Sequence, residues 1–453
     1  MEKTTRPNWI FKKHRVHKEG LCLEDQISGL PDEVLVSILS LLTMKEAART
    51  SLLSKRWRYM WTHIKGLNFD ALHIIYEVLL GDKELEVERP LYLSWINQVL
   101  KLYNGPTIDE FRVQFNLDES CEFDIDNWVN FAIEKRVKRL ELDFFEGRGR
   151  TEGYNFPCTD SITNHLHSLS LGFTSCNSLT NLLLAHVNVT GQVLEYFLTN
   201  CPFLEQLSVR DSGSLVNLKV PDLSLKLKRL EILYCFNVES IEIFAMNLVS
   251  FKYFGRKINL PFKSVQEPVE MRIGGDYCKH LIYNLVGIST FLSKLESLTL
   301  GLTFPKSSIQ FAKFPVFKKL KQLELVITAR DDASLIDFAP LIEACPFLYK
   351  FVLQLHWVDP ILRRKRRRVA SSPHLYLKVV ELIGFVGRTI DVELAMYLIK
   401  GAVMLEKITL DTREPLLEGT PWEFEETKKR VAARKRAQKL GAELPAGATL
   451  LIL

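Results

Sequence analysis

The chain has 453 residues, of which 47% are hydrophobic and 25% charged, a balance typical of a folded protein with two or three domains. The net charge of +5 is small for this length and does not indicate wholesale nucleic-acid binding. No apolar run reaches the roughly 18 residues of a membrane span, and the basic start lacks the apolar core of a signal peptide. Eight cysteines without a CxxC pair suggest reduced thiols, as in the cytosol or nucleus.

Residues 25–67 carry three short helical segments with more apolar side chains than such a short stretch can bury. Pro31 opens the first segment, and Glu33 suits the positive end of the helix dipole. Thr43 and Glu46 have the spacing of a capping box that starts the second. Because so small a unit is marginal alone, we expect its apolar surface to dock on a partner or on the rest of the chain.

This segment resembles the F-box, through LPDEVL (30–35), AARTS (47–51) and LSKRWR (53–58). The resemblance implies a three-helix module that binds the Skp-type adaptor of SCF ubiquitin ligases and, through it, a cullin and a RING protein. The alternative is a generic helical bundle at the N-terminal end. The expected adaptor-binding residues are Leu30, Pro31, Val34, Leu35, Ile38, Leu39, Leu42, Leu53 and Trp57.

Over residues 108–373 and beyond, one pattern of six residues returns: apolar, two variable, apolar, one variable, apolar. Several intervals lie between 23 and 29 residues, the period of leucine-rich repeats, in which each unit adds one strand to a parallel sheet. Residues 256–290 break the pattern, so we expect an irregular solenoid with a loose middle. The copies begin at Ile108, Val137, Leu166, Leu179, Leu204, Leu227, Val238, Leu248, Leu295, Leu320, Leu348, Leu377 and Leu405.

Two longer intervals, residues 189–204 and 331–348, predict helices, and both end in Cys-Pro-Phe-Leu. The proline ends each helix, and the leucine enters the next strand. The repeated tetrapeptide indicates a duplicated unit. We interpret Cys201 and Cys345 as small buried apolar residues and not as metal ligands or redox groups.

The flanking regions complete the predicted organisation. Residues 1–24 are expected to form a flexible basic tail, and residues 68–107 a helical linker that caps the N-terminal end of the repeat sheet. Residues 374–412 resemble the FBD region at the end of plant F-box/leucine-rich-repeat proteins, and 413–453 predict a basic helix and tail. The predicted fold class is α/β: the F-box, then an irregular leucine-rich-repeat solenoid, with helices and turns on the outer side of a curved parallel sheet.

Catalytic motifs are missing from the sequence. It has no P-loop, HExxH or GxSxG, and no set of nucleophile, base and oxyanion donors that converges by pattern. His14, His17 and Cys22 imitate a metal cluster but lack a fourth ligand. We therefore expect no catalytic residue, cofactor or metal.

Two basic runs leave their role open between nuclear import, phosphate contact and plain solvation. One lies at residues 428–436 on a predicted helix, and the other in a predicted loop. Neither run has the interleaved aromatic residues of nucleic-acid-binding proteins, so we expect no nucleic-acid partner. We expect the chain in the nucleus, the cytoplasm or both. The loop run comprises Arg363, Arg364, Lys365, Arg366, Arg367 and Arg368.

Together these patterns and resemblances predict a non-catalytic receptor subunit of a cullin–RING ligase, in which the solenoid binds a target protein of unknown identity. One alternative is a protein-interaction scaffold outside any ligase. A less favoured one is a nucleic-acid-associated protein that uses residues 363–368. Whether the solenoid binds a small-molecule ligand stays open, because nothing in the sequence maps a pocket onto the repeats.

Overall fold

The computed structural model divides the chain into two compact units, Met1–Ile64 and Lys65–Leu453, which are described separately below. The described residues are 27, 29–145, 153–157, 177–221, 226–244, 247–258, 269–283, 294–303, 314–329, 334–357, 372–420 and 422–453.

The first unit contains the three predicted helical segments, although the third is made of two 3₁₀ turns instead of an α-helix. The capping box is confirmed: the Thr43 hydroxyl accepts from the Glu46 N–H (3.3 Å), and the Glu46 carboxylate accepts from the Thr43 N–H (3.0 Å). The elements are α1 (Asp32–Leu39), α2 (Met44–Arg49), η1 (Thr50–Leu52) and η2 (Trp57–His63).

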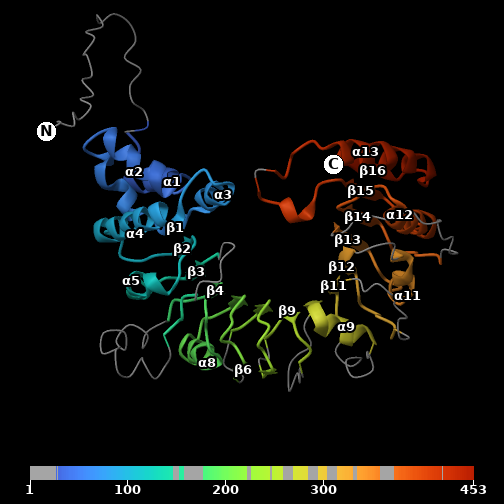
Figure 1. Cartoon of the computed structure of the whole chain (residues 1–453), viewed down its shortest axis with the longest axis horizontal. Helices are drawn as coiled ribbons and strands as arrows, with labels where there is room; N and C mark the ends of the chain where they lie inside the picture. Colours follow the sequence, from blue (N-terminus) through green and yellow to red (C-terminus); the bar gives the residue numbers. More distant parts are fainter. Residues whose placement is uncertain are drawn as a thin grey trace, which may run out of the picture. The chain divides into compact units, whose positions relative to one another are not determined.

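The second unit is built on parallel strands that follow one another in chain order (Figure 1). Their bounds are β1 (Gly66–Asp70), β2 (Glu110–Gln114), β3 (Arg139–Asp143), β4 (Asn181–Ala185), β5 (Gln206–Arg210), β6 (Asn217–Val220), β7 (Arg229–Leu233), β8 (Ser240–Ile243), β9 (Ser250–Gly255), β10 (Glu270–Gly274), β11 (Ser297–Thr303), β12 (Gln322–Ala329), β13 (Lys350–Trp357), β14 (Val379–Ile383), β15 (Lys407–Asp411) and β16 (Thr449–Ile452). Among the described residues, 14 of these strands form one sheet, and β6 pairs only with β8 in a second. The predicted fold class is confirmed.

Every copy of the repeat pattern that falls on described residues runs into a strand; the copy at Leu166 lies outside them. In β7, for example, Leu230 and Ile232 are buried, while Arg229 and Leu233 alternate with them on the other face. This alternation follows from the two-residue period of a strand. The side chains at the apolar positions of the pattern therefore form the core, and those at the variable positions form the inner face of the sheet.

One copy does not join the main sheet. The pattern at Val238 forms β8, which pairs with β6 and leaves β7 hydrogen-bonded directly to β9. The reason is spacing, because Leu227 and Leu248 already lie one repeat apart and Val238 falls halfway along the return path. The prediction that each unit adds a strand to one parallel sheet was wrong for this copy.

Strands also occur where the sequence predicted none. In the expected loose middle, β10 pairs in register with both β9 and β11. β1 (Gly66–Asp70) spans the boundary between the predicted F-box segment and the predicted linker, and β16, inside the predicted C-terminal tail, pairs with β15. The edge strand of a sheet offers unpaired N–H and C=O groups, so the extended segments of β1 and β16 join its two ends without the full leucine pattern.

Helices α4, α5, α8, α11 and α12 lie on the outer side of the sheet (Figure 1). Both predicted Cys-Pro-Phe-Leu helices are present, and burial holds the pKa of the Cys345 thiol far above its usual range. The predicted cap helix, α4, instead connects β1 to β2, and its Tyr92 ring stacks on Phe115 (4.3 Å between centroids). The remaining elements are α3 (Leu72–Leu80), α4 (Leu85–Leu102), η3 (Glu119–Cys121), α5 (Glu122–Glu134), α8 (Gly191–Asn200), α9 (Gly275–Tyr283), η5 (Leu335–Phe338), α11 (Ala339–Glu343), α12 (Thr389–Gly401), η6 (Pro415–Leu417), α13 (Lys428–Leu440) and η7 (Gly441–Glu443).

Candidate functional site

The first unit leaves an apolar surface exposed. Helix α1 carries two apolar stripes: Leu35 and Leu39 are fully buried, whereas Val34 and Ile38 on the neighbouring stripe are 41% and 39% exposed. Isolated exposed leucines are ordinary, but a concentration of them in so short a unit indicates an interaction surface. The exposed aliphatic set on the helices and turns comprises Val34, Ile38, Leu41, Leu42, Leu52 and Leu53.

This burial corrects part of the predicted adaptor site. Leu35, Leu39 and Trp57 are core residues, because one stripe of α1 packs toward η2. They cannot touch a partner in this conformation. Of the other predicted residues, Leu30 is half-buried and Pro31, Val34, Ile38, Leu42 and Leu53 are exposed. Leu41 and Leu52, at 85% and 89% exposed, were missing from the predicted adaptor site.

The start of α1 is held by Arg56. Its guanidinium donates to the Leu30 carbonyl and to the Asp32 carboxylate, both at 2.5 Å. The Asp32 side chain is largely exposed, so the pair contributes little stability, on the order of 0–1 kcal/mol. Its effect is geometric: it fixes the chain at Leu30 and Pro31 against the segment that precedes η2.

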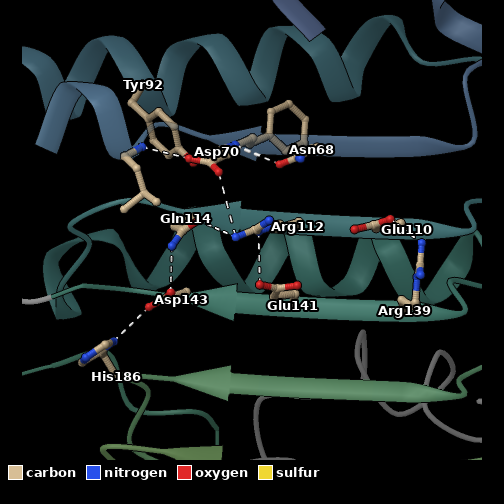
Figure 2. Close-up of polar contacts among 12 residues, drawn as sticks. Asn68, Asp70, Tyr92, Glu110, Arg112, Gln114, Arg139, Glu141, Asp143 and His186 are labelled. Atoms are coloured by element: carbon tan, nitrogen blue, oxygen red, sulfur yellow. Dashed lines mark hydrogen bonds and ion pairs between the residues drawn. The ribbon is translucent and has the colours of Figure 1, made fainter. Parts of the chain in front are cut away.

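On the second unit, the inner face of β1 to β4 carries a continuous polar network (Figure 2). Arg112 pairs with Glu141 (3.1 Å) and donates to Gln114 (2.6 Å). Gln114 in turn donates to Asp143 (2.9 Å), whose other oxygen lies 2.9 Å from His186 Nδ1. The Arg112–Gln114 bond lies within β2, and each other link joins one repeat to the next, so the network fixes side chains on a surface that the outer helices do not cover.

The network continues at Glu231, which is buried between two cations. Lys252 lies 2.9 Å and Arg210 3.3 Å from its carboxylate, and Ser208 donates to it. Burial alone would raise the pKa of Glu231, but the hydrogen bond and charge of Lys252, with the charge of Arg210, outweigh it and leave the pKa below its usual value. Glu231 is therefore ionised at neutral pH, and its carboxylate is already paired with Lys252 and Arg210.

Next to this network the inner face becomes aromatic. Leu233, Phe254 and Gly274 lie opposite one another in register on β7, β9 and β10. The rings of Tyr234 and Phe254 lie 4.5 Å apart, and Phe236 lies 6.4 Å from Tyr234. The sequence analysis missed this group because it considered only the apolar positions of the repeat, which are buried. The available signal was an apolar residue, Leu233 or Phe254, directly after the six-residue pattern.

Three successive repeats place a non-glycine residue in the left-handed region directly after the strand. They are His186, Asp211 and Tyr234, with φ of 55°, 51° and 59°. Such a conformation costs about 1–2 kcal/mol for an L-residue, and strain of this kind concentrates at functional surfaces. Each amide still donates to the neighbouring repeat, as from Tyr234 to the Phe254 carbonyl (2.7 Å), so the sheet holds the strain in place.

Other predicted features lie elsewhere. The basic run at 363–368 and the imitation metal cluster at His14, His17 and Cys22 fall outside the described residues. Within the described residues, no group of three or more His, Cys, Asp or Glu side chains could hold a metal ion, and no helix has the length and apolar character to cross a membrane. The basic helix α13 is confirmed.

A short helical unit with an exposed apolar face, followed by a parallel sheet that gains one strand per repeat, defines an F-box/leucine-rich-repeat protein. Family models agree: the At1g61320/AtMIF1 LRR domain matches residues 99–439, and the F-box domain matches residues 27–67. The chain therefore belongs to this leucine-rich-repeat family and carries an F-box.

Curated relatives from Arabidopsis thaliana carry matching names. The FBD-associated F-box protein At5g38590 is 33% identical over 191 residues, 41% of this chain and 44% of that protein. The F-box/LRR-repeat protein At3g03360 is 28% identical over 338 residues, which cover 67% of this chain and 64% of that protein. The putative F-box/LRR-repeat protein At1g56400 is 23% identical over 425 residues, which cover 83% of this chain and 86% of that protein. The alignments to the first two therefore span 44% and 64% of the relatives' own length.

Proposed function

We propose that this chain is the target-recognition subunit of an SCF-type ubiquitin ligase. The exposed aliphatic set of the first unit docks on a Skp-type adaptor, which connects it to a cullin and a RING protein. The solenoid binds the target protein. The observation that supports this most is the exposed second stripe of α1, with Val34 and Ile38, beside the exposed turns that carry Leu41, Leu42, Leu52 and Leu53.

The chain itself performs no chemistry in this proposal. Its contribution is proximity: a target held on the solenoid presents a lysine to a charged conjugating enzyme at high effective concentration. An apolar face suits this task because burying each aliphatic side chain against an adaptor is worth about 1.5–3 kcal/mol. The interface therefore needs no catalytic group.

The adaptor assignment is tested with the full chain co-expressed with a Skp-type adaptor. The double variant Ile38→Glu, Leu53→Glu places two charges on the proposed interface while leaving the buried Leu35 and Leu39 intact. We expect the amount of adaptor retained in a pull-down to fall at least about a hundredfold, since each 1.4 kcal/mol is a factor of ten. The control Leu80→Glu, an exposed leucine at the end of α3, should retain the adaptor fully.

Two outcomes would contradict the proposal. Undiminished adaptor binding by the double variant would refute this surface as the interface. Wild-type chain that binds neither adaptor nor cullin would favour the alternative of an interaction scaffold outside any ligase. Circular dichroism of each variant shows whether the first unit is still folded.

For localisation we propose the nucleus, the cytoplasm or both, with residues 363–368 as an import signal. The second basic run supports import less, because α13 uses its arginines in contacts. Arg434 pairs with Glu426 (2.6 Å), Arg430 donates to the Glu425 carbonyl (2.7 Å), and Arg436 donates to the Val386 carbonyl (3.2 Å). A fluorescent fusion in which the 363–368 cations are neutralised should lose any nuclear signal, whereas one with Lys428 and Lys429 neutralised should keep it.

A further inference from the structure

We propose that the inner face of β7, β9 and β10 binds an extended acidic segment of a partner protein, through an aromatic or aliphatic side chain next to an acidic one. The aromatic patch is defined as Tyr234, Phe236 and Phe254. The inference deepens the proposed function, since the partner would be the target for ubiquitination. It rests on three observations: an exposed aromatic cluster, a glycine floor beneath it and an unpaired cation beside it.

The aromatic patch is exposed although its members contact one another. Tyr234 and Phe236 are each 47% exposed, and Phe254 is half-buried. Aromatic side chains are a main source of binding energy when a partner buries them. Tyr234 also occupies the left-handed backbone region, where glycine or asparagine would be easier to accommodate. The strained backbone position therefore carries the large Tyr234 ring, which does not pack in the core.

Glycine beneath Phe254 lets its ring lie along the sheet. A Cβ at Gly274 would come 2.1 Å from Phe254 Cδ2, so any side chain there would displace the ring. Gly301, the next residue in register on β11, would place its Cβ 3.5 Å from Phe254 Cε2. Val326 follows in the same row on β12 and is half-buried. Gly274 and Gly301 are both buried, so the Phe254 ring covers them, and the half-buried Phe254 and Val326 are the apolar side chains of this row that a partner can reach.

Charge gives the surface a direction. Arg272 lies opposite Lys252 in register and diagonally beside Phe254, is exposed, and has no hydrogen-bond or ion-pair partner among the described residues. Lys252, by contrast, is paired with buried Glu231. On the other side of the patch the sign changes, because Asp211 is exposed next to Tyr234. An acidic residue of the partner is therefore favoured over β9 and β10 and disfavoured over β5.

The same elements, aromatic rings and cations, also bind single-stranded nucleic acid. The acidic neighbours argue against it here. Asp211 lies beside the patch and Glu270 beside Arg272 on β10, and a phosphate backbone needs an uninterrupted cationic track. A peptide can place one acidic side chain on Arg272 and avoid the carboxylates.

The experiment uses a displayed library of random twelve-residue peptides, selected against the purified full chain. We expect the enriched peptides to combine an aromatic or aliphatic residue with a neighbouring Asp or Glu. One enriched peptide is then synthesised with a fluorophore, and its Kd is measured by anisotropy. Arg272→Glu and Phe254→Ser should each raise Kd at least about tenfold, from a lost charge pair and a lost ring contact. Changing the acidic residue of the peptide to lysine should restore binding to Arg272→Glu.

Matched controls separate the patch from general effects. Lys400→Glu makes the same charge change at an exposed position of α12, and Phe123→Ser removes an exposed ring at the start of α5; both should leave Kd unchanged. Tyr234→Gly guards against misfolding, since it relieves the backbone. It should keep the melting temperature within a few degrees or raise it, while Kd rises about tenfold.

The proposal is overturned if no peptide is enriched, if the enriched peptides are basic, or if the patch variants bind as the wild type does. It is also overturned, in favour of a nucleic-acid surface, if an oligothymidylate binds with the same dependence on Arg272 and Phe254. Adaptor pull-down with the patch variants should be unaffected. A failed Ile38→Glu, Leu53→Glu test alongside a positive peptide result would remove the ligase role and leave the docking surface.

Discussion

At the scale of single residues, α1 shows that similar apolar side chains can have different roles: some form the core and others face outward. Leu35 and Leu39 are separated by one turn and hold the unit together, whereas Val34 and Ile38, one position earlier, face outward. Both stripes satisfy helical periodicity, so the pattern alone does not distinguish them. The distinction comes from which stripe η2 covers.

Asp391 is a second residue whose environment decides its chemistry. It lies in the first turn of α12, is almost fully buried, and accepts from the amides of Val386 and Gly387, both at 2.8 Å. Burial raises the pKa of Asp391 to about 6, against an ordinary value of 3.8, although these hydrogen bonds oppose the shift. The folded chain thus holds this proton more tightly than the unfolded chain.

This shift predicts a pH dependence of stability. Because the folded-state pKa is raised, the stabilisation from Asp391 is complete below about pH 4 and is lost as pH rises through about 6. Asp391→Asn keeps an oxygen for the two amides and removes the charge. We expect the variant to be more stable than the parent at pH 7.5, by about 1 kcal/mol or more, with the difference shrinking toward pH 4. Urea unfolding at both pH values measures this, and an equal difference at both would contradict it.

At the scale of elements, each repeat joins a strand of fixed alternation to a return path of variable form. The return path is a helix in α8 and α12, but a strand in β8. The strand is constant because buried leucines at alternate positions meet those of the next repeat in register. The return path must only cover the outer face, so its form follows the number of residues available.

The junction of α8 with β6 gives a test at this scale. Gly191 begins α8, and a Cβ there would lie 1.8 Å from the Asn217 carbonyl oxygen on β6. Alanine gains at most about 1 kcal/mol of helix propensity over glycine, whereas overpacking costs about 1–3 kcal/mol. We therefore expect Gly191→Ala to lower the free energy of unfolding of the second unit, measured in urea. Gly66→Ala, where nothing lies within 4 Å, is the control and should be near neutral. A stabilised Gly191→Ala would show that α8 shifts freely on β6.

At the scale of the whole second unit, one contact joins segments from opposite ends of the sheet. Tyr76 on α3, directly after β1, meets Trp422, between β15 and α13, edge to face with centroids 5.9 Å apart. An ion pair of Arg413 with Glu423 (2.8 Å) steadies the segment next to Trp422. An aromatic pair of this kind contributes about 0.5–1.5 kcal/mol.

Removing this pair should loosen both ends together. In Trp422→Ala we expect faster hydrogen exchange in α3 and in residues 413–427, with β7 and β9 unchanged, as measured by mass spectrometry. The neighbouring exposed Phe424→Ala is the control and should leave α3 unaffected. If exchange in α3 is the same in Trp422→Ala as in the parent, the contact contributes nothing to holding the ends.

Much of the fold could be predicted from the sequence because it depends on local spacing. The capping box at Thr43, the strands at each described copy of the repeat and the helices before Cys201 and Cys345 all follow from the positions of a few residue types. The F-box segment was recognised in the same way. Such features need only the period of a strand or helix, which the order of residues states directly.

What the tertiary structure alone decided is which exposed groups come together. The inner face brings Tyr234, directly after β7, together with Phe254 on β9 and Arg272 on β10, beside Gly274. Likewise, only packing showed that Leu35, Leu39 and Trp57 belong to the core and that β10 and β16 complete the sheet. The sequence determines what each strand and helix buries, because burial follows a local period. Which side chains meet across repeats depends on register and stacking, and those exist only once the sheet has formed.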